Sequence, residues 1–243
     1  MVNSSGWRGR GGKAPRCELG HCRRTGAHTI LLAMQPSQLL AFVLPALVAC
    51  STTSGSGVAK TESRSVDSYD SVEVHGALDV EITVGPAASL SVTADDNILP
   101  FIKTEVVGDE LNVHSEGSLR PDTPIKVVIT TPALEGLEIH GASDASVTGV
   151  ATDDFEATAH GASDLTLKGK TDTLEVEAHG ASKIDAVGLV AKHAEVEAHG
   201  ASKIDLSELE ALDAKLSGAS RCTYAGDPTI DENLSGASSL AKR

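Results

Sequence analysis

Four histidines recur in the second half of the chain at a nearly constant spacing, and three of them follow a glutamate by two residues. Imidazole and carboxylate groups are accepted ligands of zinc and related divalent metals. Neighbouring strands of a sheet would bring such side chains to within about 5 Å of one another. The pattern therefore predicts a candidate metal site between adjacent repeats, formed by His140, His160, His179, His199, Glu177 and Glu197.

Two other interpretations of these histidines stay open. They could be solvated side chains on a β-surface, multiplied when the repeat was duplicated, because ladder spacing alone does not create a tetrahedral site. They could also form a pH-responsive surface, since protonation near pH 6 would place positive charge beside the glutamates. The sequence does not choose among metal binding, pH response and simple solvation.

Each of the four histidines is followed by Gly-Ala-Ser, a tripeptide that the chain contains six times. The copies begin at Gly141, Gly161, Gly180, Gly200, Gly218 and Gly236, which are 18 to 20 residues apart. A period of this size is typical of one supersecondary unit stacked on copies of itself. Glycine adopts backbone conformations that other residues resist, and alanine and serine are small. We therefore expect a tight corner at each copy.

The segments on both sides of each corner alternate polar and apolar residues, as in Val196-Glu197-Ala198-His199. This alternation is typical of strands with one buried face. Further glycines at Gly149, Gly169, Gly188 and Gly226 predict a second turn after the second strand of a repeat, and this signal is missing near residues 208–211. The fold expected is all-β: a right-handed parallel β-helix, or β-solenoid, with coils of roughly 20 residues.

The repeats divide the chain into segments. Residues 134–243 are expected to form the solenoid, and residues 66–133 show short alternating stretches that predict an all-β N-terminal cap. The final Gly-Ala-Ser suggests an incomplete last coil with an open edge, which favours pairing between copies in a homo-oligomer.

The N-terminal 49 residues have the plan of a secretory signal. Six basic residues and one acid precede a short apolar stretch that ends in Leu47-Val48-Ala49-Cys50. The stretch is too short for a comfortable bilayer span. An ordinary cleaved signal and a short membrane anchor are alternatives, and Met34 is an alternative start.

Leu47-Val48-Ala49-Cys50 resembles the lipobox of bacterial lipoproteins. The resemblance implies lipidation of Cys50 and a lipidated, flexible tether over residues 50–65. It also implies an outer-membrane lipoprotein of the bacterial cell envelope, facing the periplasm or the cell surface, because Ser51 follows the cysteine.

Charge and repetition exclude two classes of function. The net charge is −14, and the segment after the basic leader is more acidic still, so nucleic acid is excluded as a partner. The run His160-Gly161-Ala162-Ser163-Asp164 contains the residue types of a hydrolase. A catalytic triad must converge once, however, whereas these residues recur at every corner. We expect no enzyme, no catalytic residue and no cofactor.

Three stretches carry a resemblance to a known family. They are Val72-Glu73-Val74-His75-Gly76-Ala77-Leu78-Asp79, Gly108-Asp109-Glu110-Leu111-Asn112-Val113, and the run from Ile125 to Leu134, followed by serial small-residue turns. The chain from residue 66 to 238 resembles the bacterial exported family called "putative auto-transporter adhesin, head GIN domain". The resemblance implies a β-helical, lipid-anchored envelope protein that presents a repetitive surface for adhesion or scaffolding. The membrane, through the lipid, and an unidentified protein or surface are then the expected partners.

Overall fold

The computed structural model describes residues 52–243 of the chain. The expected leader at residues 1–49, the alternative start Met34 and the expected lipidation site Cys50 lie outside the described residues. From residue 52 onward the regular structure is β, apart from the short 3-10 helix η1 (Leu99–Phe101). In this part of the chain no helix has the length and apolar character needed to cross a membrane. The all-β prediction is confirmed.

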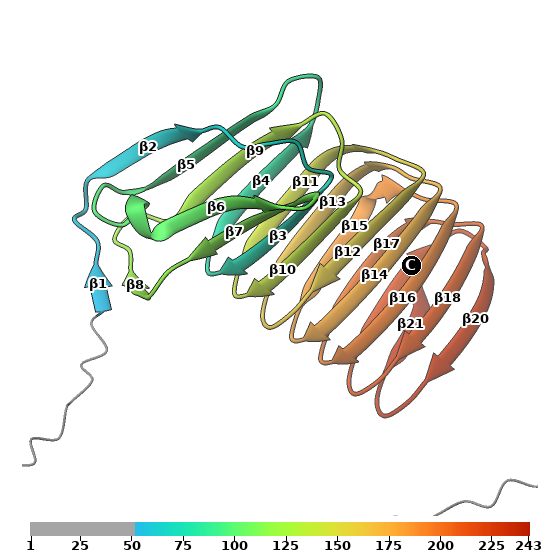
Figure 1. The fold of residues 1–243 in the computed structure, drawn as a ribbon. Coiled ribbons are helices and arrows are strands. Elements are labelled where there is room, and N and C mark those ends of the chain that lie inside the picture. Colours follow the sequence, from blue (N-terminus) through green and yellow to red (C-terminus); the bar gives the residue numbers. More distant parts are fainter. Residues whose placement is uncertain (1–51) are drawn as a thin grey trace, which may run out of the picture. The chain divides into compact units, whose positions relative to one another are not determined.

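Two large sheets face each other (Figure 1). The first sheet has nine strands, in the spatial order β20 (Thr229–Leu234), β18 (Ala211–Leu216), β16 (His193–Gly200), β14 (Thr173–Gly180), β12 (Asp154–Ala159), β10 (Gly136–Gly141), β3 (Ser71–Gly76), β7 (Glu110–Ser115) and β6 (Ile102–Val107). The second has ten, in the order β2 (Ala59–Arg64), β5 (Ser89–Asp95), β9 (Lys126–Thr131), β4 (Asp79–Val84), β11 (Asp144–Ala151), β13 (Asp164–Lys170), β15 (Lys183–Val190), β17 (Lys203–Glu208), β19 (Arg221–Ala225) and β21 (Ser239–Lys242).

The chain alternates between the two sheets, so each repeat contributes one strand to each. Neighbouring repeat strands pair in parallel and mostly residue for residue, as where β14 meets β16 with Glu177 opposite Glu197. Stacked parallel sheets of this kind are consistent with the β-helix-like fold that the repeats predict. The right-handedness of the coil and its length stay predictions.

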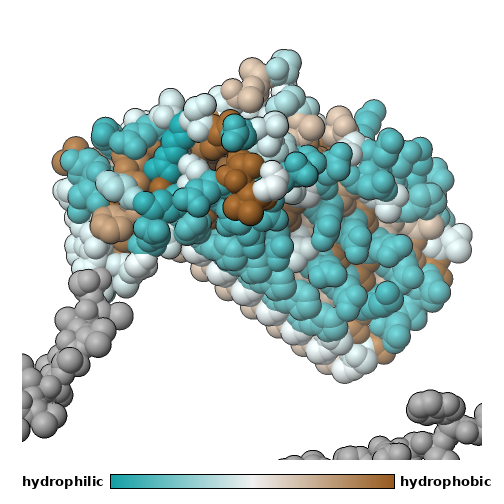
Figure 2. Space-filling view, viewed as in Figure 1, coloured by the Kyte–Doolittle hydropathy of each residue, from teal (hydrophilic) through white to brown (hydrophobic). Residues whose placement is uncertain are grey.

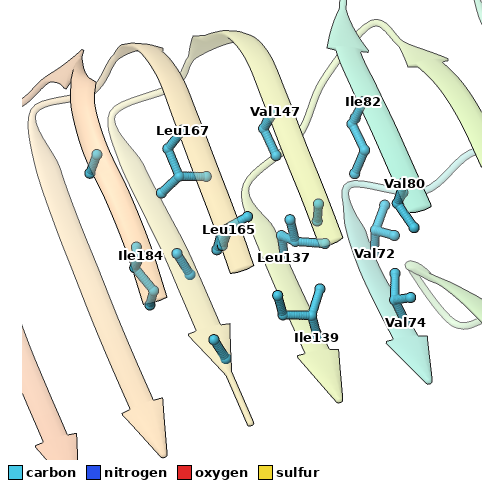
Figure 3. Packing of buried hydrophobic residues seen from close by; sticks show 14 of the residues in the cluster. Val72, Val74, Val80, Ile82, Leu137, Ile139, Val147, Leu165, Leu167 and Ile184 are labelled. Atoms are coloured by element: carbon cyan, nitrogen blue, oxygen red, sulfur yellow. The ribbon is translucent and has the colours of Figure 1, made fainter. Parts of the chain in front are cut away.

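Alternation of apolar residues accounts for the core between the sheets. Inward-facing columns of valine, leucine, isoleucine and alanine from both sheets fill it, with Leu137, Ile139, Val147, Leu165 and Leu167 among the members drawn in Figure 3. Cys222 continues one of these columns next to Ile204, and its burial raises the pKa of the thiol to about 12. Small core residues suit the narrow space between two close sheets.

The N-terminal segment continues both sheets. Strand β3 pairs in parallel with β10, and β4 pairs with β11, so these two strands form a coil stacked directly on the repeats. The next layer outward is made by β7 and β9, which come later in the sequence. Antiparallel strands β2, β5 and β6 complete this end of the two sheets.

The segment expected as a flexible tether is partly strand. Strand β1 (Thr52–Ser54) pairs in parallel with β8 (Ser118–Arg120), and β2 pairs with β5. The buried Asp95 carboxylate accepts hydrogen bonds from the backbone N–H groups of Gly57, Asp122 and Thr123 and from the Thr123 hydroxyl. A polar Ser/Thr/Gly composition favours a flexible tether. In residues 52–64, however, strand pairing and the hydrogen bond from Gly57 to the Asp95 carboxylate hold the chain against the domain.

The second turn occurs at Gly226, directly after β19, but not at the other three glycines that predicted it. Gly149, Gly169 and Gly188 lie within β11, β13 and β15, and the chain turns two to four residues later. Gly149 and Gly169 have positive φ angles of 83° and 145°, and the register of β11 against β13 shifts beside Gly149. A glycine with this conformation inside a strand is typical of a β-bulge.

Candidate functional site

The corners take the shape that the tripeptide predicts. Gly161 has a φ of +87°, and a Cβ on it would collide with the carbonyl oxygen of Gly141 in the preceding coil. That carbonyl accepts a 2.8 Å hydrogen bond from the N–H of Ala162. Equivalent bonds link the later corners, so the glycine is needed both for its backbone angle and for the close approach between coils.

The serine of each corner has a role beyond small size. Ser163, Ser182 and Ser202 are buried, and each hydroxyl donates a hydrogen bond of 2.8 to 3.1 Å to the carbonyl of the histidine three residues earlier. The corner thereby fixes the backbone of the histidine that precedes it.

In-register pairing turns these corners into a single row of imidazoles on the outer face of the nine-stranded sheet. His75, His140, His160, His179 and His199 stack with ring centroids 4.4, 4.6, 4.7 and 5.0 Å apart, and the first three rings are within 4° of parallel. We call these five residues the histidine column. Hydrophilic residues dominate the surface over the repeat strands of this sheet (Figure 2).

Carboxylates lie beside the column and contact its Nε2 atoms. Glu73 Oε1 is 2.8 Å from His75 and 3.6 Å from His140. Glu138 Oε1 is 2.8 Å from His140 and 3.4 Å from His160. Each of these two carboxylates therefore bridges two neighbouring coils.

The glutamates expected as metal ligands form simpler pairs. Glu177 Oε2 is 3.7 Å from His179 Nε2, and Glu197 Oε1 is 2.9 Å from His199 Nε2. The other ring nitrogen of His199 lies 2.6 Å from the Ser217 hydroxyl. The six expected residues thus lie along one face. Among residues 52–243, however, the sets of three side chains close enough to share a metal ion are Glu73–His75–His140 and Glu138–His140–His160.

Glu73 and His75 were missed by the sequence analysis because their coil lacks the complete Gly-Ala-Ser signal. The residues that follow His75 are Gly76-Ala77-Leu78, and the buried Leu78 stands where later corners have serine. The run His75-Gly76-Ala77 matches the His-Gly-Ala of the later coils, and this match was the signal that could have placed His75 with the other histidines. His114 extends the register by one more position on β7.

Burial, hydrogen bonds and repulsion between acids shift the pKa values of three glutamates on this face. Burial opposes ionisation of Glu73, but hydrogen bonds from His75 and Asn112 outweigh it and lower the pKa of this carboxyl. The hydrogen bond with His199 lowers the pKa of Glu197. Burial, followed by repulsion from Glu175 and other acids, raises the pKa of Glu156 in the neighbouring outer column. The ionised form is therefore favoured at Glu73 and Glu197.

The fold and this face define a β-helix-like protein whose outer surface repeats from coil to coil. The chain belongs to the family described as "Putative auto-transporter adhesin, head GIN domain", whose model matches residues 68–228. No curated protein matches the chain.

Three solved structures share the fold. A "putative adhesin" from Bacteroides fragilis is 21% identical, with a TM-score of 0.65 over 78% of this chain and 98% of that one. A "putative lipid binding protein" from Parabacteroides distasonis is 22% identical, with a TM-score of 0.53 over 79% and 100%. A "putative adhesin" from Parabacteroides merdae is 16% identical, with a TM-score of 0.51 over 79% and 99%. At these identities the likeness concerns the fold alone.

Proposed function

We propose that the protein is a non-enzymatic, lipid-anchored component of the bacterial cell envelope that presents its repeated outer face for adhesion or scaffolding. Membership in a family named for adhesin heads supports an extracellular or envelope location. The observation that carries the proposal is the histidine column, in which one outward residue recurs through five stacked coils. Repetition of this kind suits binding to an extended or repetitive partner.

The serines within Gly-Ala-Ser do not pair with the histidines as nucleophiles would, although Ser217, which precedes a corner, contacts His199 Nδ1 at 2.6 Å. In a nucleophile–base pair the hydroxyl bonds to the imidazole. Ser163 instead points into the core and bonds to the backbone carbonyl of His160. The same holds for Ser182 and His179. These hydroxyls stabilise corners and are shielded from a substrate.

A lipid anchor at Cys50 would connect the domain to a membrane, and its processing can be tested directly. We expect Cys50→Ala, or globomycin treatment of the wild type, to make the uncleaved precursor accumulate on immunoblots of bacterial fractions. Cys222→Ser is the matched control because Cys222 is buried in the core, so this variant should be processed normally. Unchanged processing of Cys50→Ala would refute the lipid anchor.

The adhesive role requires that anchored protein increase cell attachment. Cells expressing the wild type should adhere to a solid surface or to one another more than cells expressing Cys50→Ala at equal protein level. Protease treatment of intact cells would report whether the domain is exposed. Exposed, lipidated protein that leaves attachment unchanged would contradict adhesion, whereas protein protected in the periplasm would leave scaffolding as the proposed role.

A homo-oligomer through the last coil is part of the proposal. Strands β20 and β21 are edge strands of the two sheets, and every residue of β20 is exposed, including Ile230 and Leu234. Exposed edges favour pairing with another chain. We expect Ile230→Lys to shift sedimentation toward the monomer, since a lysine on an edge opposes pairing; a wild type that sediments as a monomer at high concentration would exclude this interface.

A further inference from the structure

We propose that Glu73, His75 and His140 form a binding site for one divalent transition-metal ion of the zinc class, with Glu138 and His160 as an overlapping set. This goes beyond a role in adhesion or scaffolding. It also moves the metal hypothesis away from Glu177 and Glu197, toward the end of the column where carboxylates bridge two coils.

The donor atoms are already close together. In each of the two groups one carboxylate oxygen and one ring nitrogen from each of two imidazoles lie within 4.8 Å of one another. Ligand atoms around a tetrahedral zinc ion at about 2.0 to 2.1 Å lie about 3.3 Å apart. Glu73 Oε1 meets this spacing with His75 and His140 at 2.8 and 3.6 Å, so the main adjustment needed is between the two imidazoles.

That adjustment is a rotation of the rings. The rings of His75 and His140 are stacked 4.4 Å apart with an interplanar angle of 4°. Lone pairs in the planes of parallel rings run side by side, so at least one ring must turn to share an ion. The two side chains are 43% and 28% exposed, and the χ2 torsion of histidine is broad, which leaves the rings free to turn. Metal binding should therefore disrupt the stack at this point.

An outer partner holds the bridging carboxylate in place. Asn112 donates hydrogen bonds to Glu73 Oε2 at 2.5 Å and to Glu110 Oε1 at 3.2 Å. Glu73 Oε1 remains directed at the two imidazoles. Glu73 is also the more shielded bridge, with 20% of its side chain exposed against 39% for Glu138. Outer hydrogen bonds of this kind orient metal ligands and raise affinity.

His140 belongs to both groups, and one nitrogen lone pair binds one ion. Two overlapping groups that share His140 Nε2 therefore supply one metal position. Loss of His75 leaves the Glu138 group available, whereas loss of His140 removes both. His140 is thus the residue whose replacement tests the site.

The column itself supplies a conservative replacement and a matched control. Ser217 and Ser235 follow β18 and β20 at the position that the histidines occupy in earlier coils, so His140→Ser introduces a residue that later coils carry at this position. His193 is an exposed histidine in a different column, where Ala211 is its partner on the next strand, so His193→Ala is the control. Circular dichroism melts of both variants would show that the fold is kept.

Calorimetric titration of the purified full chain with Zn²⁺ tests the proposal. We expect the wild type and His193→Ala to bind alike, and His140→Ser to lose one zinc equivalent or to bind it more than tenfold more weakly. Histidines and cysteines elsewhere contribute equally to all three proteins, so the difference isolates the site. Asn112→Ala should weaken the same event less than His140→Ser does, because the Glu138 group does not depend on Asn112.

Imidazole resonances give a second readout. Substoichiometric Zn²⁺ should shift or broaden the ring signals of His75 and His140 before those of His193. Equal zinc binding by the wild type and His140→Ser, or ring shifts confined to histidines outside the column, would overturn the proposal.

Discussion

At the scale of single residues, Gly161 meets two demands, a positive φ angle and a close approach to the preceding coil, whereas Gly108 meets only the first. The φ of Gly161 is +87°, and a Cβ would collide with the Gly141 carbonyl oxygen. Gly108, in the turn between β6 and β7, has a φ of +68° but open space around it. We expect Gly108→Ala to cost about 1 to 2 kcal/mol for the left-handed backbone. Gly161→Ala should cost more, because the spacing between coils must also open.

Urea unfolding of the two alanine variants measures this difference. A larger loss of unfolding free energy for Gly161→Ala than for Gly108→Ala supports the close-approach role of the corner glycine. Equal losses would mean that only the backbone angle matters.

The corner glycines and the outer columns could be predicted from the sequence because each depends on a local signal. Gly-Ala-Ser carries its own turn chemistry, and alternation places His179 and Glu177 on one face. Because Leu78 replaces the serine of Gly-Ala-Ser, the sequence pattern did not identify His75 as equivalent to the later histidines. Which carboxylate bridges two coils depends on side-chain orientation across strands, which spacing does not determine.

At the scale of elements, Asp95 ties the first two strands to the rest of the domain. Burial alone would raise the pKa of this carboxyl, but the hydrogen bonds from Thr123, Asp122 and Gly57 outweigh it and lower the pKa. A lowered folded-state pKa contributes stability above the unfolded-state pKa, and this stability is lost as the pH falls toward the folded value. We therefore expect the contribution of this contact to be lost progressively as the pH falls below the unfolded-state pKa of the carboxyl.

Urea midpoints measured from neutral pH into the acid range should fall for the wild type. In Asp95→Asn the midpoint should be lower at neutral pH and should depend less on pH in that range, because the titrating group is gone. Parallel profiles for the two proteins would show that Asp95 does not hold these strands.

The order of elements was harder to predict than their type. Strands β7 and β9 lie outside β3 and β4 although they follow them in the sequence. Such pairings join residues far apart in the chain, and no local periodicity reports them. The strands at residues 52–64 have a polar composition that is also typical of tethers. A glycine in a bulge cannot be distinguished by its sequence from a glycine in a turn, because both positions favour the same residue.

At the scale of the whole molecule, the central claim is that one outward position recurs through the entire stack in a single column. His75 on β3 and Ser235, which follows β20, are six strand spacings apart in the nine-stranded sheet, and His114 lies one position beyond His75. At about 4.8 Å per strand the separation from His75 to Ser235 is about 29 Å. The proposed adhesive or scaffolding surface depends on that continuity.

Pulsed electron–electron distance measurement between nitroxides at these two positions tests the claim most directly. His75→Cys and Ser235→Cys would be labelled in a protein whose Cys17, Cys22 and Cys50 are replaced by serine, while the buried Cys222 stays unlabelled. The account predicts one distance distribution centred near 29 Å, broadened by the label arms. A centre beyond about 40 Å, or two separate populations, would contradict a continuous in-register column.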